Sequence, residues 1–153
     1  MTTYFDSSAL VPVYVPERFA KAARLAVRAA SQVQFTALHE LEIPNAFELL
    51  VGCGLITRVQ YRAIQAYLRE DLESQRLMPV SLDLERVFTE ASEFSRLYTE
   101  KVPARSLDLL HVAAAHLAPC IRFVSADDRQ LAAAKATGLE TVDIKHPVRR
   151  QKS

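Results

Sequence analysis

The chain has 153 residues, of which 50% are hydrophobic, and this length suits one compact domain with a single substantial core. Charged residues make up 24% of the sequence and nearly cancel to a formal net charge of +1, so any affinity for nucleic acid must come from a local patch. The first residues lack the basic start of a secretory signal, and no apolar run has membrane-spanning length. We therefore expect a cytoplasmic protein with no membrane association.

The two cysteines give no sign of a zinc site or a disulfide framework. Cys53 and Cys120 form no CxxC pair and have no histidine at metal-binding spacing. Free cysteines are often part of a protein core. We expect both thiols to be reduced and buried.

Short β-prone runs alternate with longer helical patterns along the chain. The β-prone runs cover residues 4–5, 33–36, 77–80, 121–124 and 141–144. The helical patterns cover residues 17–30, 57–75, with Thr57 as its N-cap, 83–100 and 105–117, and a last helix opens at Asp127 and ends at Gly138. This alternation predicts an α/β domain with a mainly parallel sheet.

No internal repeat, low-complexity tract or linker divides the chain, so we expect one domain over residues 1–146. The basic residues Arg149, Arg150 and Lys152 fall in a tail over residues 147–153, which we expect to be flexible. A contact between this tail and RNA is the alternative.

Two aspartates directly follow predicted strands. Asp6 comes after the first strand, and Asp127 comes after the fourth. In an open parallel sheet, ligands bind outside the carboxyl ends of the strands, so both carboxylates are expected at the same edge. Either residue is also a suitable helix N-cap, and Gln130 stands at capping-box spacing from Asp127, so capping is the competing interpretation.

Two more acids belong to helical segments. Asp108 lies one turn into the most apolar helix, where a carboxylate is costly unless a cation or hydrogen bonds compensate it, and an ion pair with Arg105 is the alternative. Glu42 lies near the start of the helix that follows the second strand, and the alternative is an exposed first-turn residue. Pro44 indicates that this helix starts or kinks there.

If the four acids converge at one edge of the sheet, they repel one another unless a divalent cation neutralises them. Oxygen ligands without His or Cys suit Mg²⁺ or Mn²⁺ better than zinc. Such an ion lowers the pKa of a bound water and stabilises charge on a phosphoryl group, so this pattern is typical of phosphodiester hydrolysis.

Four stretches of the sequence resemble the signature stretches of PIN domains, in the family's order. They are residues 4–10, the segment from Glu42 to Ala46, residues 107–113 and residues 123–127. The resemblance spans roughly residues 3–144 and is especially close to the VapC-type ribonuclease toxins of bacterial toxin–antitoxin pairs.

This resemblance implies a three-layer α/β/α sandwich and a metal-dependent endoribonuclease that cleaves single-stranded RNA regions with Mg²⁺ or Mn²⁺. It also implies a homodimer and a cognate antitoxin that blocks the acids, often through an arginine. The catalytic and metal-binding roles would belong to Asp6, Glu42, Asp108 and Asp127, with Ser8 and Ser125 supporting the metal site.

Further residues lie near the four stretches. Arg105 and Arg129 are candidates for contacts with the RNA backbone. Glu40 and Asp128 stay open as participants, because each stands close to an acid of the quartet. We expect His111 to be a satisfied core residue rather than a metal ligand.

Two other functions fit parts of the pattern. A catalytically silent PIN-like module would keep the fold and use the acids to bind an arginine-rich partner peptide. A phosphatase of the haloacid-dehalogenase type would need a second Asp two residues after Asp6, where this chain has Ser8. We therefore predict a nuclease, with the silent module as the alternative.

Overall fold

The computed structural model describes residues 2–147. A strand is present at each of the five places where the sequence predicted one. The strands are β1 (Thr2–Phe5), β2 (Gln32–Phe35), β3 (Leu77–Pro79), β4 (Arg122–Ser125) and β5 (Glu140–Asp143). The helices are α1 (Ser7–Tyr14), α2 (Ala20–Ala29), α3 (Ala37–Gly52), α4 (Arg58–Glu73), α5 (Leu84–Tyr98), α6 (Ser106–Leu117) and α7 (Asp128–Ala136).

The five strands form one parallel sheet in the order β3-β2-β1-β4-β5. The chain moves outward from β1 to β3, then crosses to β4 and moves outward in the other direction. The strand order therefore reverses between β1 and β4. An open α/β sheet binds ligands in the crevice at such a reversal, outside the carboxyl ends of the strands.

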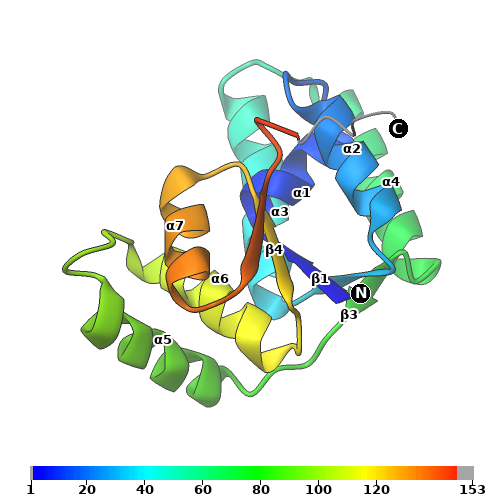
Figure 1. Ribbon diagram of the computed structural model, residues 1–153. Helices are drawn as coiled ribbons and strands as arrows, with labels where there is room; N and C mark the ends of the chain where they lie inside the picture. The colour runs from blue at the N-terminus through cyan, green and yellow to red at the C-terminus, as the bar shows by residue number, and fades with distance from the viewer. Residues whose placement is uncertain (1, 148–153) are drawn as a thin grey trace, which may run out of the picture.

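Helices cover both faces of the sheet, with α5, α6 and α7 at the left of Figure 1 and α1, α2 and α4 at the right. The residues of β1 alternate between the two cores. Phe5 packs in the core under α1 to α4, whereas Tyr4 packs in the core under α5 to α7. The predicted α/β class and parallel sheet are confirmed, and the architecture is a three-layer sandwich.

Local signals in the sequence set two of the helix ends. Thr57 caps α4 as expected, because its hydroxyl accepts a hydrogen bond from Gln60 N at 3.1 Å, and Gln60 Oε1 accepts one from Thr57 N at 2.8 Å. Gly138 follows α7 with a φ of +93°, a conformation that glycine adopts without a Cβ penalty.

Two helices differ from the expectation. The predicted helical patterns did not include α1, which carries Pro12 inside it, although the capping interpretation of Asp6 implied a helix start there. The helix start expected at Pro44 is wrong, because α3 begins at Ala37 and contains Pro44 in its interior. His39 Nδ1 accepts the Thr36 N–H at 2.9 Å and so stabilises this earlier start. Glu42 consequently lies in the second turn of α3 rather than the first.

The exposure of one cysteine is a further difference. Cys120 is buried as expected, but the expected burial of Cys53 is wrong, because Cys53 is exposed at the end of α3, next to Gly54 in a turn with a φ of +70°. Residues 148–153 of the predicted tail lie outside the described part of the chain. Among residues 2–147, no helix is both long and apolar enough to cross a membrane.

A buried polar contact ties α1 to α4. Tyr14 donates to Oδ2 of the buried Asp71 at 2.6 Å, and Arg76 donates to Oδ1 of the same carboxylate at 2.5 Å. The Tyr14→Phe change removes the first donor, so we expect the free energy of unfolding to fall by about 1–2 kcal/mol in urea unfolding. Tyr67→Phe, at an exposed position of α4, is the control and should shift stability by less than about 0.5 kcal/mol. Equal effects of the two changes would contradict this account.

Candidate active site

Asp6 lies at the carboxyl end of β1 and is completely buried. Its Oδ1 accepts hydrogen bonds from Ser8 Oγ at 2.7 Å and from Ala9 N at 3.0 Å, and its Oδ2 accepts one from Ser125 Oγ. All three donors are neutral. Burial raises the pKa of Asp6 from 3.8 to about 6, because the hydrogen bonds only partly replace the lost hydration.

Asp127 lies just beyond β4, the neighbour of β1 in the sheet. Its Oδ1 accepts from Arg129 N at 2.9 Å and Gln130 N at 3.1 Å, so Asp127 caps α7. Ser125 connects it to Asp6, because Ser125 Oγ accepts from Asp127 N at 2.9 Å while donating to Asp6. The two aspartates are thus linked through one hydroxyl.

Asp108 is buried at the start of α6. Its Oδ2 accepts from Arg105 N at 2.9 Å and lies 3.6 Å from Arg105 Nε. A second nitrogen of the same guanidinium lies 3.9 Å from Oδ2 of Asp127. Arg105 therefore lies between these two acids, and its positive charge offsets part of their repulsion.

Glu42 projects from α3 and is partly buried. Its Oε1 accepts from Ser7 Oγ at 2.9 Å and is hydrogen-bonded to His111 Nε2. Burial alone would raise the pKa of Glu42, but the hydrogen bond and charge of His111, together with Ser7, outweigh burial and lower it. Glu42 is thus an acid whose ionised form the surrounding donors stabilise.

The structure contains the helix caps and the arginine contact that were the competing interpretations of three of the acids. Asp6 and Asp127 do cap helices, and Asp108 does contact Arg105. Capping does not exclude a second role, since each carboxylate keeps an oxygen that the cap does not use. The exposed first-turn interpretation of Glu42 is wrong, because Glu42 lies in the second turn and is hydrogen-bonded on both sides.

The neighbouring acids lie apart from this network. Asp128 is exposed and pairs with Lys145 at 2.5 Å, which lowers the pKa of Asp128. Glu40 is exposed on α3. The four acids singled out in the sequence fall into two sets of contacts. Asp6, Asp127 and Asp108 are connected through Ser125 and Arg105, and Glu42 is hydrogen-bonded to Ser7 and His111.

The donor chemistry around these acids suits a hard divalent cation, since they offer carboxylate oxygens and no lysine or arginine in the described part of the chain contacts Asp6. The side-chain arrangement does not yet form such a site. Within residues 2–147, no three Asp, Glu, His or Cys side chains are grouped closely enough to hold a metal ion. Arg105 lies in the space between Asp108 and Asp127 that an ion would need.

The sequence did not single out Ser7 or His39, and the expectation that His111 is a satisfied core residue is confirmed, because it is buried and both its ring nitrogens are hydrogen-bonded. Ser7 donates to Glu42, and His111 does so from the opposite helix. His39 donates to the carbonyl oxygen of Phe5, directly before Asp6, at 2.6 Å. One signal was available, because His39 precedes Glu42 by three residues and His111 follows Asp108 by three, the spacing of one helix face.

A groove of about 930 Å³ borders the acids. Glu42, Ser7 and Ser8 line it together with exposed leucines of α3 and neighbouring segments. Those leucines are Leu41, Leu49, Leu55 and Leu107. An apolar surface of this kind beside a polar site is typical of an interaction surface.

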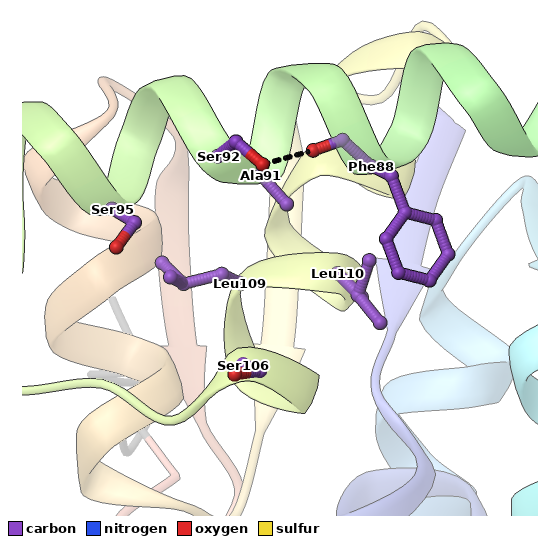
Figure 2. A pocket seen from close by; sticks show the side chains of 7 residues that line it. All are labelled: Phe88, Ala91, Ser92, Ser95, Ser106, Leu109 and Leu110. Carbon is purple, nitrogen blue, oxygen red and sulfur yellow. Dashed lines mark hydrogen bonds between the residues drawn. The ribbon is translucent and has the colours of Figure 1, made fainter.

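A second cavity, of about 320 Å³, lies between α5 and α6 (Figure 2). Phe88 and Leu110 lie at one end of it, and its polar groups are serine hydroxyls, of which that of Ser92 donates to Phe88 O at 2.8 Å. None of the residues that line it carries a carboxylate or a cation. This cavity therefore offers no charged group for catalysis.

The buried Asp6 should destabilise the metal-free protein above pH 6. Between pH 4 and 6 the folded chain keeps a proton on Asp6 that the unfolded chain releases, so the free energy of unfolding falls as the pH rises through this window. In EDTA at pH 7.5, we expect Asp6→Asn to be more stable than the wild type, by on the order of 2–3 kcal/mol in urea unfolding.

The difference between Asp6→Asn and the wild type should shrink at pH 4, where Asp6 is protonated in the folded chain. Asp128→Asn, at an exposed site one residue from Asp127, is the control and should show no such gain. A wild type as stable as Asp6→Asn at pH 7.5 would contradict the assigned desolvation.

No protein-family model and no curated protein sequence matches the chain. Several solved structures match it over nearly the full length. VapC20 from Mycobacterium tuberculosis, a Sarcin-Ricin loop cleaving toxin, has a TM-score of 0.65 at 15% identity over 92% of this chain and 98% of its own. FitAcB from Neisseria gonorrhoeae has a TM-score of 0.63 at 14% identity over 94% of this chain and 99% of its own.

VapBC2 from Rickettsia felis, solved with a DNA fragment from its promoter, has a TM-score of 0.62 at 12% identity, over 94% of this chain and 98% of its own. At identities this low, the structural matches establish the fold and leave the activity open. The predicted resemblance is therefore confirmed for the fold: this chain has the fold of the VapC and FitB PIN-domain toxins.

Proposed function

We propose that the protein is a metal-dependent endoribonuclease that cleaves single-stranded regions of RNA. The observation that carries this proposal is the Asp6 carboxylate, which is fully buried at the strand-order reversal and contacts only neutral donors. Asp127 is linked to it through Ser125, Arg105 connects Asp127 to Asp108, and Glu42 accepts from Ser7, the residue after Asp6. A buried carboxylate with nearby acids favours a bound divalent cation over an uncompensated charge.

Under this proposal, Asp6, Glu42, Asp108 and Asp127 bind Mg²⁺ or Mn²⁺. The ion would supply a water of lowered pKa and stabilise negative charge on the RNA phosphate. Ser8 and Ser125 hold Asp6 in a fixed orientation through their hydroxyls.

Binding of the ion requires the Arg105 guanidinium to withdraw from Asp108 and Asp127. The side chain of Arg105 is 67% exposed, and its contacts with the two acids are 3.6 and 3.9 Å long, so such a movement costs little. Once displaced, Arg105 remains at the edge of the site, where it can contact an RNA phosphate. Arg129 at the start of α7 is the second residue that we assign to the RNA backbone.

We also propose that the protein is the toxin of a type II toxin–antitoxin system, acting in the cytoplasm as a homodimer. The fold matches VapC20 and structures of VapBC complexes. The leucine-lined groove next to Glu42 offers an apolar surface to an antitoxin segment, and the acids offer a counter-charge to an arginine on that segment.

The nuclease proposal predicts cleavage that depends on both metal and acids. Purified protein should cut a single-stranded RNA in Mg²⁺ or Mn²⁺ and stop in EDTA. Asp6→Asn and Asp108→Asn should each lower kcat/KM by about a hundredfold or more, since each removes a ligand whose loss is worth about 3 kcal/mol. Asp128→Asn is the matched control and should retain activity. Cleavage that persists in EDTA would overturn the proposal.

The silent module is the second candidate, and one observation favours it: the acids Asp108 and Asp127 already accept a guanidinium, that of Arg105. This alternative predicts tight binding of an arginine-rich peptide in isothermal titration calorimetry, with no heat from Mn²⁺. The nuclease proposal predicts Mn²⁺ binding that Asp6→Asn abolishes. Peptide binding without Mn²⁺ binding would decide for the silent module.

A further inference from the structure

A buried chain of hydrogen bonds reaches Glu42 from the interior of the protein. Tyr4 Oη lies 2.7 Å from His111 Nδ1, and His111 Nε2 is hydrogen-bonded to Glu42 Oε1. Tyr4 and His111 are both almost completely buried, at 0% and 1% exposure. The three residues come from β1, α6 and α3, so the chain connects the central strand with two acid-bearing helices.

When the His111 ring is neutral, the partners set the direction of each hydrogen bond. The Tyr4 phenol carries its proton at neutral pH and donates it to His111 Nδ1. A neutral imidazole that accepts at Nδ1 carries its proton on Nε2, which therefore donates to the carboxylate of Glu42. Tyr4 thus selects the tautomer of His111 that faces Glu42 with a donor.

Both donors to Glu42 bind the same oxygen. Ser7 Oγ donates to Oε1 at 2.9 Å, and His111 Nε2 donates to Oε1 as well. Within residues 2–147, Oε2 accepts no hydrogen bond and forms no ion pair. One oxygen of Glu42 is therefore fixed by the protein, and the other is free for an external ligand.

A second histidine supports this arrangement. The His39 ring lies 5.3 Å from that of His111 and 5.1 Å from that of Tyr4, measured between centroids. His39 Nδ1 accepts from Thr36 N at 2.9 Å, so its Nε2 donates to Phe5 O at 2.6 Å. The rings fill the space between β1, α3 and α6, and this packing limits the movement of His111.

We infer that His111 is a positioning residue that orients Glu42 so that its free oxygen, Oε2, can serve as a ligand, with Tyr4 fixing the tautomer of His111. This inference rests on the proposed function for its consequence in catalysis. The hydrogen-bonded geometry on which it stands is independent of that function. Residues that hold a metal ligand through a hydrogen bond typically contribute 10–100-fold to metal affinity or activity.

Two substitutions at position 111 separate the donor role from packing. In His111→Gln, the amide nitrogen takes the place of Nε2 and can still donate to Glu42. In His111→Asn, the amide nitrogen takes the place of Nδ1, on the side of Tyr4, and the donor to Glu42 is lost. His116→Asn, on the same helix but bonded to Thr137, is the matched control.

The experiment measures Mn²⁺ affinity by titration calorimetry without RNA, kcat and KM on single-stranded RNA, and thermal unfolding to verify the fold. We expect His111→Asn to weaken Mn²⁺ binding and lower kcat by about 10–100-fold, while His111→Gln stays within about fivefold of the wild type and His116→Asn is unchanged. Equal losses in folded His111→Asn and His111→Gln would overturn the inference, as would full Mn²⁺ affinity in His111→Asn.

Nitrogen NMR of the imidazole tests the geometry even if the protein binds no Mn²⁺ and cuts no RNA. The neutral His111 ring should carry its proton on Nε2 in the wild type, and Tyr4→Phe should shift the balance toward the Nδ1-protonated form. A wild-type ring protonated on Nδ1 would overturn the positioning role. Absence of Mn²⁺ binding with the Nε2 tautomer intact would instead overturn the proposed nuclease function alone.

Discussion

The burial of the Asp6 carboxylate is the constraint on which the rest of the site depends. Asp6 follows the central strand β1, so it lies inside the molecule rather than at its rim, and water does not reach it. Hydroxyls of Ser8 and Ser125 and one backbone N–H replace part of the lost hydration. The remaining cost appears as a raised pKa. The cation of the proposed function would offset this cost.

The topology explains why the other acids lie near Asp6. The strand order reverses between β1 and β4, so the loop after β4 brings Ser125 and Asp127 against Asp6. The helices α3 and α6 begin beside this crevice and carry Glu42 and Asp108. Repulsion among these carboxylates is reduced by two side chains of the protein itself, the guanidinium between Asp108 and Asp127 and the imidazole donor to Glu42. A cation that binds these carboxylates would have to displace the two side chains or bind beside them.

The sheet edge also brings two different surfaces together. The acids form a polar region with high charge density, and the leucine-lined groove beside Glu42 is largely apolar. A peptide that covers the groove would bury apolar surface, which provides affinity, while a positive side chain at the acids would provide specificity. Under the proposed function, a partner in the groove would block access of RNA to Glu42, because Glu42, Ser7 and Ser8 line the groove.

The sequence by itself determined the alternation of strands and helices and the α/β class, because these depend on local periodicity. It also singled out four acids as candidates, and the resemblance to PIN domains added Ser8 and Ser125, which the structure places against Asp6. For α1, the sequence indicated only a possible cap at Asp6. The early start of α3 was not indicated, since His39 caps that start through a contact that propensities do not describe. Only the tertiary structure decided which atoms meet. The contact of His111 with Glu42 joins residues 69 positions apart and that of Ser125 with Asp6 joins residues 119 apart, and such distances in sequence are bridged only when strand order and helix packing are fixed.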